Sequence, residues 1–258
     1  MLEGRICSLP ETGTQLDTCI MKTKLTLFVT VLTAALFLGG CASSSLNKGL
    51  VAYYPFNGNA KDDSGNGNRG EVFGAELSLD RHSNIDGAYS FNGQTVISAK
   101  HHETLHLEGP MTVSVWIKPS TLDVDYQRII QKSNETYGLG YGMAIWNGGP
   151  LAFSRFQDSK YAAGDGHHVV VAYGLVLDKW QQVVAIWDND YKIFINGSSI
   201  PLRTHPYNFD GNAGSDLLIG KGQHGAFRGS IDDVRIYNRA LSANEVKALY
   251  DLEKPKAK

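Results

Sequence analysis

A tight loop rich in oxygen donors occupies residues 62–68 (DDSGNGN). Ca²⁺ binds roughly six to eight oxygens from carboxylates, amides and backbone carbonyls, and glycines let those carbonyls turn inward at positive φ. The loop therefore predicts a calcium site. An EF-hand is excluded, because Phe73 stands where its closing glutamate belongs. The alternative is a solvated Asn/Gly turn, which is common at protein surfaces.

A second set of residues has the chemistry of sugar recognition, in which aromatic rings and planar polar side chains surround a ligand. Trp116 alternates with the apolar residues of its segment, so we expect it on an open concave surface rather than in the core. The alternative for each aromatic residue is core packing. The candidate ligand-binding residues are Trp116, Tyr126, Arg128, Tyr141, Trp146, Arg155 and His224.

Composition restricts the class of protein. The 258 residues include 24 Lys and Arg against 26 Asp and Glu, which argues against a nucleic-acid partner because such a partner requires a net basic face. Apolar residues make up 42% and charged residues 19%, as in globular proteins. Three cysteines cannot supply a disulfide framework.

Residues 21–40 have the layout of a bacterial secretion signal. Lys22 and Lys24 precede an apolar run at 25–38 that is shorter than the about 20 residues of a transmembrane helix. The residues before Cys41 resemble a lipobox, which implies lipid on Cys41 and a membrane anchor; the alternative is a plain signal peptide. In such signals an Asp directly after the cysteine favours retention in the inner membrane. Ala42 stands at this position instead, which indicates the outer membrane. Residues 1–20 have no signal character and are predicted to be a non-native extension.

One domain is predicted over residues 49–252, between a tether at 41–48 and a solvated tail at 253–258. Residues 111–118 alternate between apolar and polar, residues 169–177 form a long apolar run, and Asn196-Gly197 is a hairpin turn. Ser242 and Glu245 form the capping box of one short helix. This pattern predicts an all-β, two-sheet antiparallel sandwich with a short C-terminal helix.

Several long segments resemble one known family. LVAYYPFNGNAKDDSGNGN, AYSFNG, TVSVWIKP and GSIDDVRIYNRALSANEVKALY are similar to a laminin G-like jelly roll of the concanavalin A-like lectin/glucanase superfamily, over residues 50–250. The resemblance implies a jelly roll of two curved sheets. It also implies a module that is usually non-catalytic and binds glycans or mediates adhesion.

In this family the Asn/Gly loop often holds calcium together with acidic residues of the last strand, here Asp232 and Asp233. Ile231 and Val234 have opposite parity, so only a bulge at the acidic pair lets both face the core. The resemblance therefore implies one structural calcium ion; the predicted ligands are Asp63, Asn66, Asn68 and Asp232, with Asp62 and Asp233 as alternates.

Glucanases of this fold use paired carboxylates, often in a Glu-x-Asp-x-x-Glu strand motif. Glu71 with Glu76, and Glu103 with Glu108, lack the central aspartate, and the sequence contains no other hydrolase motif. We therefore expect no enzyme. The sequence predicts a lipid-anchored glycan-binding or adhesion protein of the bacterial envelope. Two alternatives stay open: a scaffold that binds an envelope protein, and a glycoside hydrolase with an unrecognised carboxylate pair.

Overall fold

The computed structural model describes residues 45–123, 126–133, 140–146, 148–156, 168–206, 216–222 and 225–256. One compact unit spans Leu46–Lys258. Cys41 and the predicted signal lie outside the described residues, so lipidation stays a prediction. Within the described ranges, no helix is long and apolar enough to cross a membrane.

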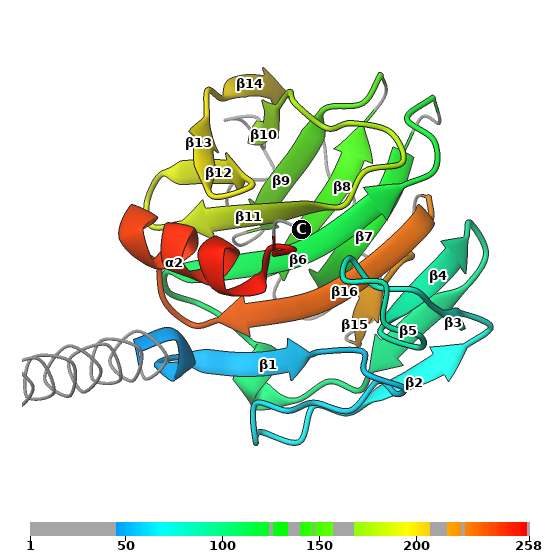
Figure 1. Ribbon diagram of the computed structural model, residues 1–258. Coiled ribbons are helices and arrows are strands. Elements are labelled where there is room, and N and C mark those ends of the chain that lie inside the picture. The colour runs from blue at the N-terminus through cyan, green and yellow to red at the C-terminus, as the bar shows by residue number, and fades with distance from the viewer. Residues whose placement is uncertain are drawn as a thin grey trace, which may run out of the picture. The chain divides into compact units, whose positions relative to one another are not determined.

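Two antiparallel sheets form a sandwich (Figure 1). Sheet A has the order β13-β12-β11-β6-β16-β4-β3, with β1 paired to β16, and sheet B has the order β14-β10-β9-β8-β7-β15-β5-β2. The strands of sheet A are β1 (Leu50–Tyr54), β3 (Glu76–Ser78), β4 (Ala88–Asn92), β6 (Met111–Pro119), β11 (Gln181–Trp187), β12 (Tyr191–Ile195), β13 (Ser198–Ile200) and β16 (Arg228–Tyr237). Those of sheet B are β2 (Gly70–Phe73), β5 (Val96–Ala99), β7 (Tyr126–Ser133), β8 (Gly140–Trp146), β9 (Leu151–Phe156), β10 (His168–Ala172), β14 (Arg203–Pro206) and β15 (Leu217–Ile219).

The core lies between the sheets and follows the predicted alternation. Met111, Val113 and Val115 on β6 are fully buried and pack in one cluster with Met143 and Phe153 of sheet B. Successive side chains of a strand point to opposite faces, so one face of β6 supplies the core. The predicted two-sheet sandwich is confirmed.

The two ends of the domain lie side by side, as the sequence predicts. Tyr54 on β1 pairs with Val234 on β16, and the hydroxyl of Ser64 donates to the carbonyl of Val51 at 3.1 Å. The hairpin at Asn196-Gly197 also forms between β12 and β13, and both residues have positive φ. These local predictions are confirmed.

The long strand predicted at 169–177 is wrong in its extent. β10 ends at Ala172, and Gly174 has a φ of 140°. Tyr173, Val176 and Leu177 are exposed instead of paired. Only glycine adopts this backbone readily, so Gly174 ends the strand although the residues around it are apolar.

Helix α2 (Ala243–Glu253) covers the outer face of sheet A (Figure 1). The predicted capping box between Ser242 and Glu245 is present. Leu241 and Val246 are buried in one cluster with Phe194 of β12. An apolar contact across the N-terminus of a helix fixes the direction in which the chain enters it. The cap therefore seats α2 on the sheet.

Two sequence predictions fail beneath α2. Trp116 does not lie on an open surface: it is 1% exposed, and its ring stacks on Tyr250 of α2 at a centroid distance of 5.9 Å. Glu253 is not in a solvated tail but is the last residue of α2 and is buried. Its carboxylate accepts hydrogen bonds from Nε1 of Trp116 at 2.7 Å and Nε2 of Gln182 at 2.9 Å. The outer face of β6 is thus a second, polar interior.

Candidate functional site

The predicted calcium loop is fixed by hydrogen bonds of its own. The Oδ1 of Asp62 accepts from the backbone N–H groups of Tyr53 and Ser64, both at 2.9 Å. Its Oδ2 accepts from the N–H of Asn68 at 2.8 Å. A carboxylate that accepts several backbone N–H bonds organises a turn in the same way as a capping residue. Asp62 is therefore the organiser of this loop.

The two asparagines of the loop donate their amide hydrogens to β1. Nδ2 of Asn66 donates to the carbonyls of Leu50 and Val51, both at 3.2 Å. Nδ2 of Asn68 donates to the carbonyl of Val51 at 2.8 Å and to Oγ1 of Thr104 at 3.0 Å. Thr104 belongs to the short helix η1 (Glu103–Leu105). These side chains join the loop to β1 and η1.

The acidic pair on β16 lies at the predicted bulge. The register between β16 and β6 shifts between Asp232 and Arg235, and Asp233 has a φ of 45°. Ile231 and Val234 are both buried, as the parity argument requires. The prediction of a bulge is confirmed.

Two arginines neutralise the acidic pair. Nη1 of Arg81 lies 2.5 Å from Oδ2 of Asp232, and its Nη2 lies 2.5 Å from Oδ2 of Asp233. Nη1 of Arg235 lies 3.5 Å from Oδ1 of Asp233 and also pairs with Glu253. Burial and then the charge of Asp233 raise the pKa of Asp232, whereas Arg81 lowers it. A buried carboxylate needs such a partner.

These donors do not fit a shared calcium ion. The acidic pair faces guanidinium groups, and the asparagines of the loop face carbonyl oxygens with their N–H groups. In the part of the chain that the structure describes, no cluster of three or more His, Cys, Asp or Glu could hold a metal. The loop and the bulge are neighbours through Tyr53, whose hydroxyl donates to Asp233 at 2.6 Å. Calcium binding stays a prediction, and no step is derived from it.

Three of the predicted ligand-binding residues gather on the outer face of sheet B. Tyr126 pairs with Trp146, and Arg128 pairs with Ala144, across β7 and β8. Ile145, which alternates with Ala144 and Trp146, is buried between the sheets. The side chains of Tyr126, Arg128 and Trp146 therefore share the opposite face.

The aromatic rings of this face are held in place by their neighbours. Arg128 is 1% exposed, so the prediction that it contacts a ligand is wrong; its guanidinium lies 4.7 Å from the ring centroid of Tyr126 and supports that ring. Trp146 packs against Ala152 of β9 and Val171 of β10. A Cβ at Gly142 would lie 2.8 Å from Nη1 of Arg128, so this glycine lets the arginine lie flat on the sheet. Tyr126 and Trp146 stay half-buried beside a floor of small residues.

The other predicted ligand residues are placed differently. Tyr141 is 1% exposed within the core between the sheets, where burial raises the pKa of its hydroxyl. Arg155 is also buried, and its guanidinium lies 4.0 Å from the ring centroid of Trp187. Neither residue therefore lies on the outer face of sheet B. His224 lies outside the described residues, so its role stays a prediction.

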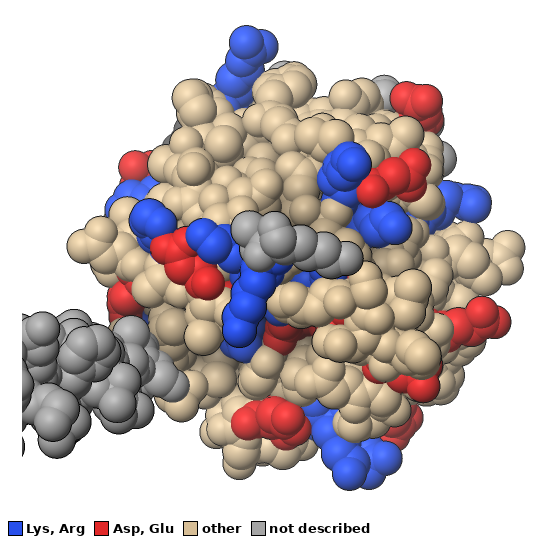
Figure 2. All heavy atoms as spheres, viewed as in Figure 1, with Lys and Arg blue, Asp and Glu red and all other residues tan. Residues whose placement is uncertain are grey.

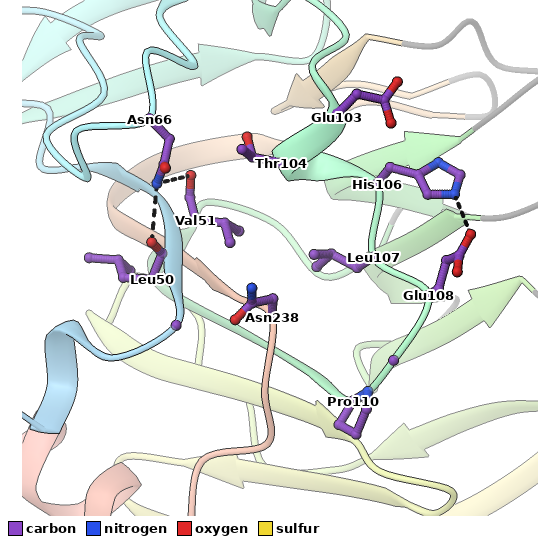
Figure 3. A pocket seen from close by; sticks show the side chains of 12 residues that line it. Leu50, Val51, Asn66, Glu103, Thr104, His106, Leu107, Glu108, Pro110 and Asn238 are labelled. Carbon is purple, nitrogen blue, oxygen red and sulfur yellow. Dashed lines mark hydrogen bonds and ion pairs between the residues drawn. The ribbon is translucent and has the colours of Figure 1, made fainter.

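The structure has a pocket at the edge of the sandwich that was not predicted from the sequence (Figure 3). The cavity has a volume of about 310 Å³, and its walls come from the start of β1, the loop at 62–68, the segment at 103–110 and Asn238 after β16. We call it the edge pocket. Glu103 and Glu108, which lack the central aspartate of a glucanase motif, belong to its lining. The spacing of residues gave no signal for this pocket, since its walls lie far apart in the chain.

Charges of both signs are mixed on the side of the molecule that carries α2 (Figure 2). Lys and Arg side chains lie beside Asp and Glu side chains, and other residues form most of this face. This pattern matches the near-neutral balance of the sequence. It offers no extended positive surface to a nucleic acid on this face.

A family profile described as the concanavalin A-like lectin/glucanases superfamily matches residues 91–247. No curated protein sequence matches the chain. Among solved structures, domain 4 of AbnA, an extracellular arabinanase from Geobacillus stearothermophilus in complex with arabinotriose, is 22% identical, with a TM-score of 0.55. That match covers 78% of this chain and 98% of the other.

Bacterial toxin domains have the same fold. A structure of botulinum neurotoxin type C, whose cell entry depends on two ganglioside molecules, is 15% identical, with a TM-score of 0.59. The binding domain of botulinum neurotoxin DC in complex with rat synaptotagmin II is 13% identical, with a TM-score of 0.57. These matches cover 81% and 80% of this chain, which spans 52% of each toxin chain.

Proposed function

We propose that this chain, which belongs to the concanavalin A-like lectin/glucanases superfamily, is a non-catalytic glycan-binding protein. We propose further that lipid on Cys41 holds it to the bacterial envelope, at the outer membrane. Membrane anchoring would place the jelly roll where it meets glycans at the cell surface or within the envelope.

The observation that carries glycan binding is the cross-strand pair of Tyr126 and Trp146 beside Arg128. An aromatic ring presents a flat apolar face to the C–H groups of a sugar. Arg128 is 1% exposed, so it supports the ring of Tyr126 and does not contact the ligand. The rings are supported from below, so little side-chain entropy is lost when a sugar is bound. Ala144 and Ala152 keep the adjacent floor low.

The absence of catalysis is supported by the partners of the buried carboxylates. Asp232 and Asp233 pair with Arg81, Glu253 pairs with Arg235, and Asp80 accepts from the N–H groups of His82 and Asn84. Glycoside hydrolysis requires two carboxyl groups on opposite sides of a bound sugar. The carboxylates named here are used to hold the fold together.

The related structures support the proposal at the level of the fold. A domain of an arabinanase was solved with arabinotriose, and a toxin depends on gangliosides. At these sequence identities the likeness shows the fold alone, so the sugar that this chain binds must be identified by experiment.

A glycan array with the purified full chain tests the proposal. We expect binding to at least one oligosaccharide, weakened at least tenfold (about 1.4 kcal/mol) by Tyr126→Ala or Trp146→Ala. Phe73→Ala is the matched control, because Phe73 is an exposed aromatic residue on β2, at the far edge of sheet B. Binding to no glycan, or equal loss in the control, would refute the proposal. For the anchor, Cys41→Ala should release the protein from membranes.

A protein partner is the second candidate, and one observation favours it. The exposed apolar side chains of Val72, Phe73, Leu77, Leu79 and Ile85 follow one another along the chain around the edge strands β2 and β3. Exposed apolar patches of this kind often bind proteins. Capture of an envelope protein that depends on Phe73, without glycan binding, would favour this scaffold function.

A further inference from the structure

The edge pocket has two walls, which the side chains of buried Arg155 and half-buried Asn66 hold in place. Arg155 donates to the carbonyl oxygens of Leu107, Glu108 and Gly109, at 2.8 Å for the first and the last. On the other side, Asn66 is tied to β1 through the carbonyls of Leu50 and Val51. Because Arg155 is 7% exposed, the loop at 107–109 is fixed from inside the protein. The pocket is therefore largely pre-formed.

Polar groups surround the space between these walls. Figure 3 shows Asn66 on one side and His106 with Glu108 on the other, with Asn238 between them. Nε2 of His106 lies 3.4 Å from Oε1 of Glu108. The side chains of Leu107 and Pro110 add an apolar part to the lining. Amide, carboxylate and imidazole groups beside an apolar wall suit a ligand that has both hydroxyls and C–H faces.

The size of the pocket argues for a small molecule and against a metal ion. A volume of about 310 Å³ lies at the lower end of ligand pockets, which span about 300–1,000 Å³. Glu103, His106 and Glu108 do not form a metal-binding cluster, since the described ranges contain none. The volume leaves room for one sugar ring beside these side chains.

The acidic side chains of the lining determine which ligands the pocket prefers. Glu103 and Glu108 both line it, and their side chains are 88% and 77% exposed. The residues that line the pocket, all of them described, include no Lys or Arg. A ligand carboxylate would meet two acidic side chains and no Lys or Arg, which disfavours its binding.

We infer that the edge pocket binds one sugar unit that carries no negative charge, and that Glu103 and Glu108 exclude acidic sugars. This inference rests on the proposed glycan binding, and it adds a second subsite that selects sugars by their charge. Arg155 acts in it as a positioning residue, because it holds the loop and does not touch the ligand.

The test uses matched pairs of sugars that differ in one charged group. Glucose, galactose and mannose, their uronic acids, and glucosamine are titrated into the isotope-labelled full chain, and amide resonances are followed by NMR. We expect a neutral or amino sugar to shift the amides of Thr104, His106 and Gly109, and the uronic acids to leave them unchanged. Asn238→Ala, which removes an exposed side chain of the lining, should weaken the effective sugar at least fivefold.

Charge removal provides the decisive variant. In Glu103→Gln with Glu108→Gln, the affinity for the uronic acid relative to its neutral partner should rise at least tenfold. The control is Glu71→Gln with Glu76→Gln, which changes the net charge equally at exposed positions on β2 and β3. Uronic acids that bind the unmodified protein as well as neutral sugars do, or an unchanged ratio in the variant, would overturn the inference.

The outcomes separate this inference from the proposed function. If array glycans bind and depend on Trp146 while no sugar shifts the pocket amides, the edge pocket is not a sugar site and the proposed function stands. If neither site responds to any glycan, both are refuted. If the pocket alone responds, the pocket inference stands and the assignment of the aromatic face fails.

Discussion

Glu253 is the residue through which we expect the C-terminal helix to be locked onto sheet A. Its carboxylate accepts hydrogen bonds from Trp116 and Gln182 and pairs with Arg235. Nε of Arg81 donates to its backbone carbonyl at 2.6 Å. Glu253→Ala would leave an indole N–H, an amide and a guanidinium buried without this acceptor.

The expected loss is large because the charge is buried. Removing one member of a buried ion pair costs about 3–5 kcal/mol. For a domain of this size, each kcal/mol lowers Tm by about 2–4 °C, which gives a total of about 6–20 °C. Asp251→Ala on the same helix is the control. The side chain of Asp251 is 39% exposed, and its pairs with Lys247 and Lys254 are surface ion pairs, which contribute little to stability.

Thermal and urea unfolding of the two variants measure this difference. A double-mutant cycle with Trp116→Phe should give a coupling of about 1.5–3 kcal/mol, the range for hydrogen bonds to charged groups. Equal losses in Glu253→Ala and Asp251→Ala, or no coupling to Trp116, would refute the reasoning that this carboxylate is a buried acceptor.

Three further predictions concern stability. Hydrogen bonds from Arg239 lower the pKa of Glu245 from 4.5 to about 2; because this folded-state pKa is depressed, its stabilisation is present above pH 4.5 and lost as the pH falls towards 2. Glu245→Gln should therefore flatten the acid limb of a urea-unfolding series between pH 5 and 2, and an unchanged limb would contradict this. Calcium and a chelator should give coincident melting curves, because Asp62, Asp232 and Asp233 already have other partners; a higher Tm with calcium would instead support the ion that the sequence predicts. Gly220→Ala should cost about 1–3 kcal/mol from overpacking alone, since its Cβ would lie 2.1 Å from Cδ1 of Phe91, and an unfolding curve like that of the unmodified protein would be the contrary result.

The predictions that succeeded rest on local rules of the chain. The bulge at Asp232-Asp233 followed from the opposite parity of two apolar neighbours, and the turn at Asn196-Gly197 from two residues that accept positive φ. The capping box at Ser242 followed from the spacing of two residues. In each case the determining residues are close together in the sequence.

The failures involve contacts between distant segments. Arg81 and Asp232 are 151 positions apart, and no local pattern links an exposed-looking arginine to an acidic pair. Trp116 shares a face with polar residues, which on a single strand indicates solvent, but α2 covers that face. The edge pocket could not be predicted for the same reason, since four separate segments must meet to form it.

The central claim, glycan binding at the aromatic face of sheet B, is tested most directly by fluorine NMR. The chain has four tryptophans, so 5-fluorotryptophan gives four resonances, which single Trp→Phe variants assign. An oligosaccharide that binds on the array should shift the resonance of half-buried Trp146 and leave that of buried Trp116 in place. Saturating binding with an unmoved Trp146 resonance would contradict the account.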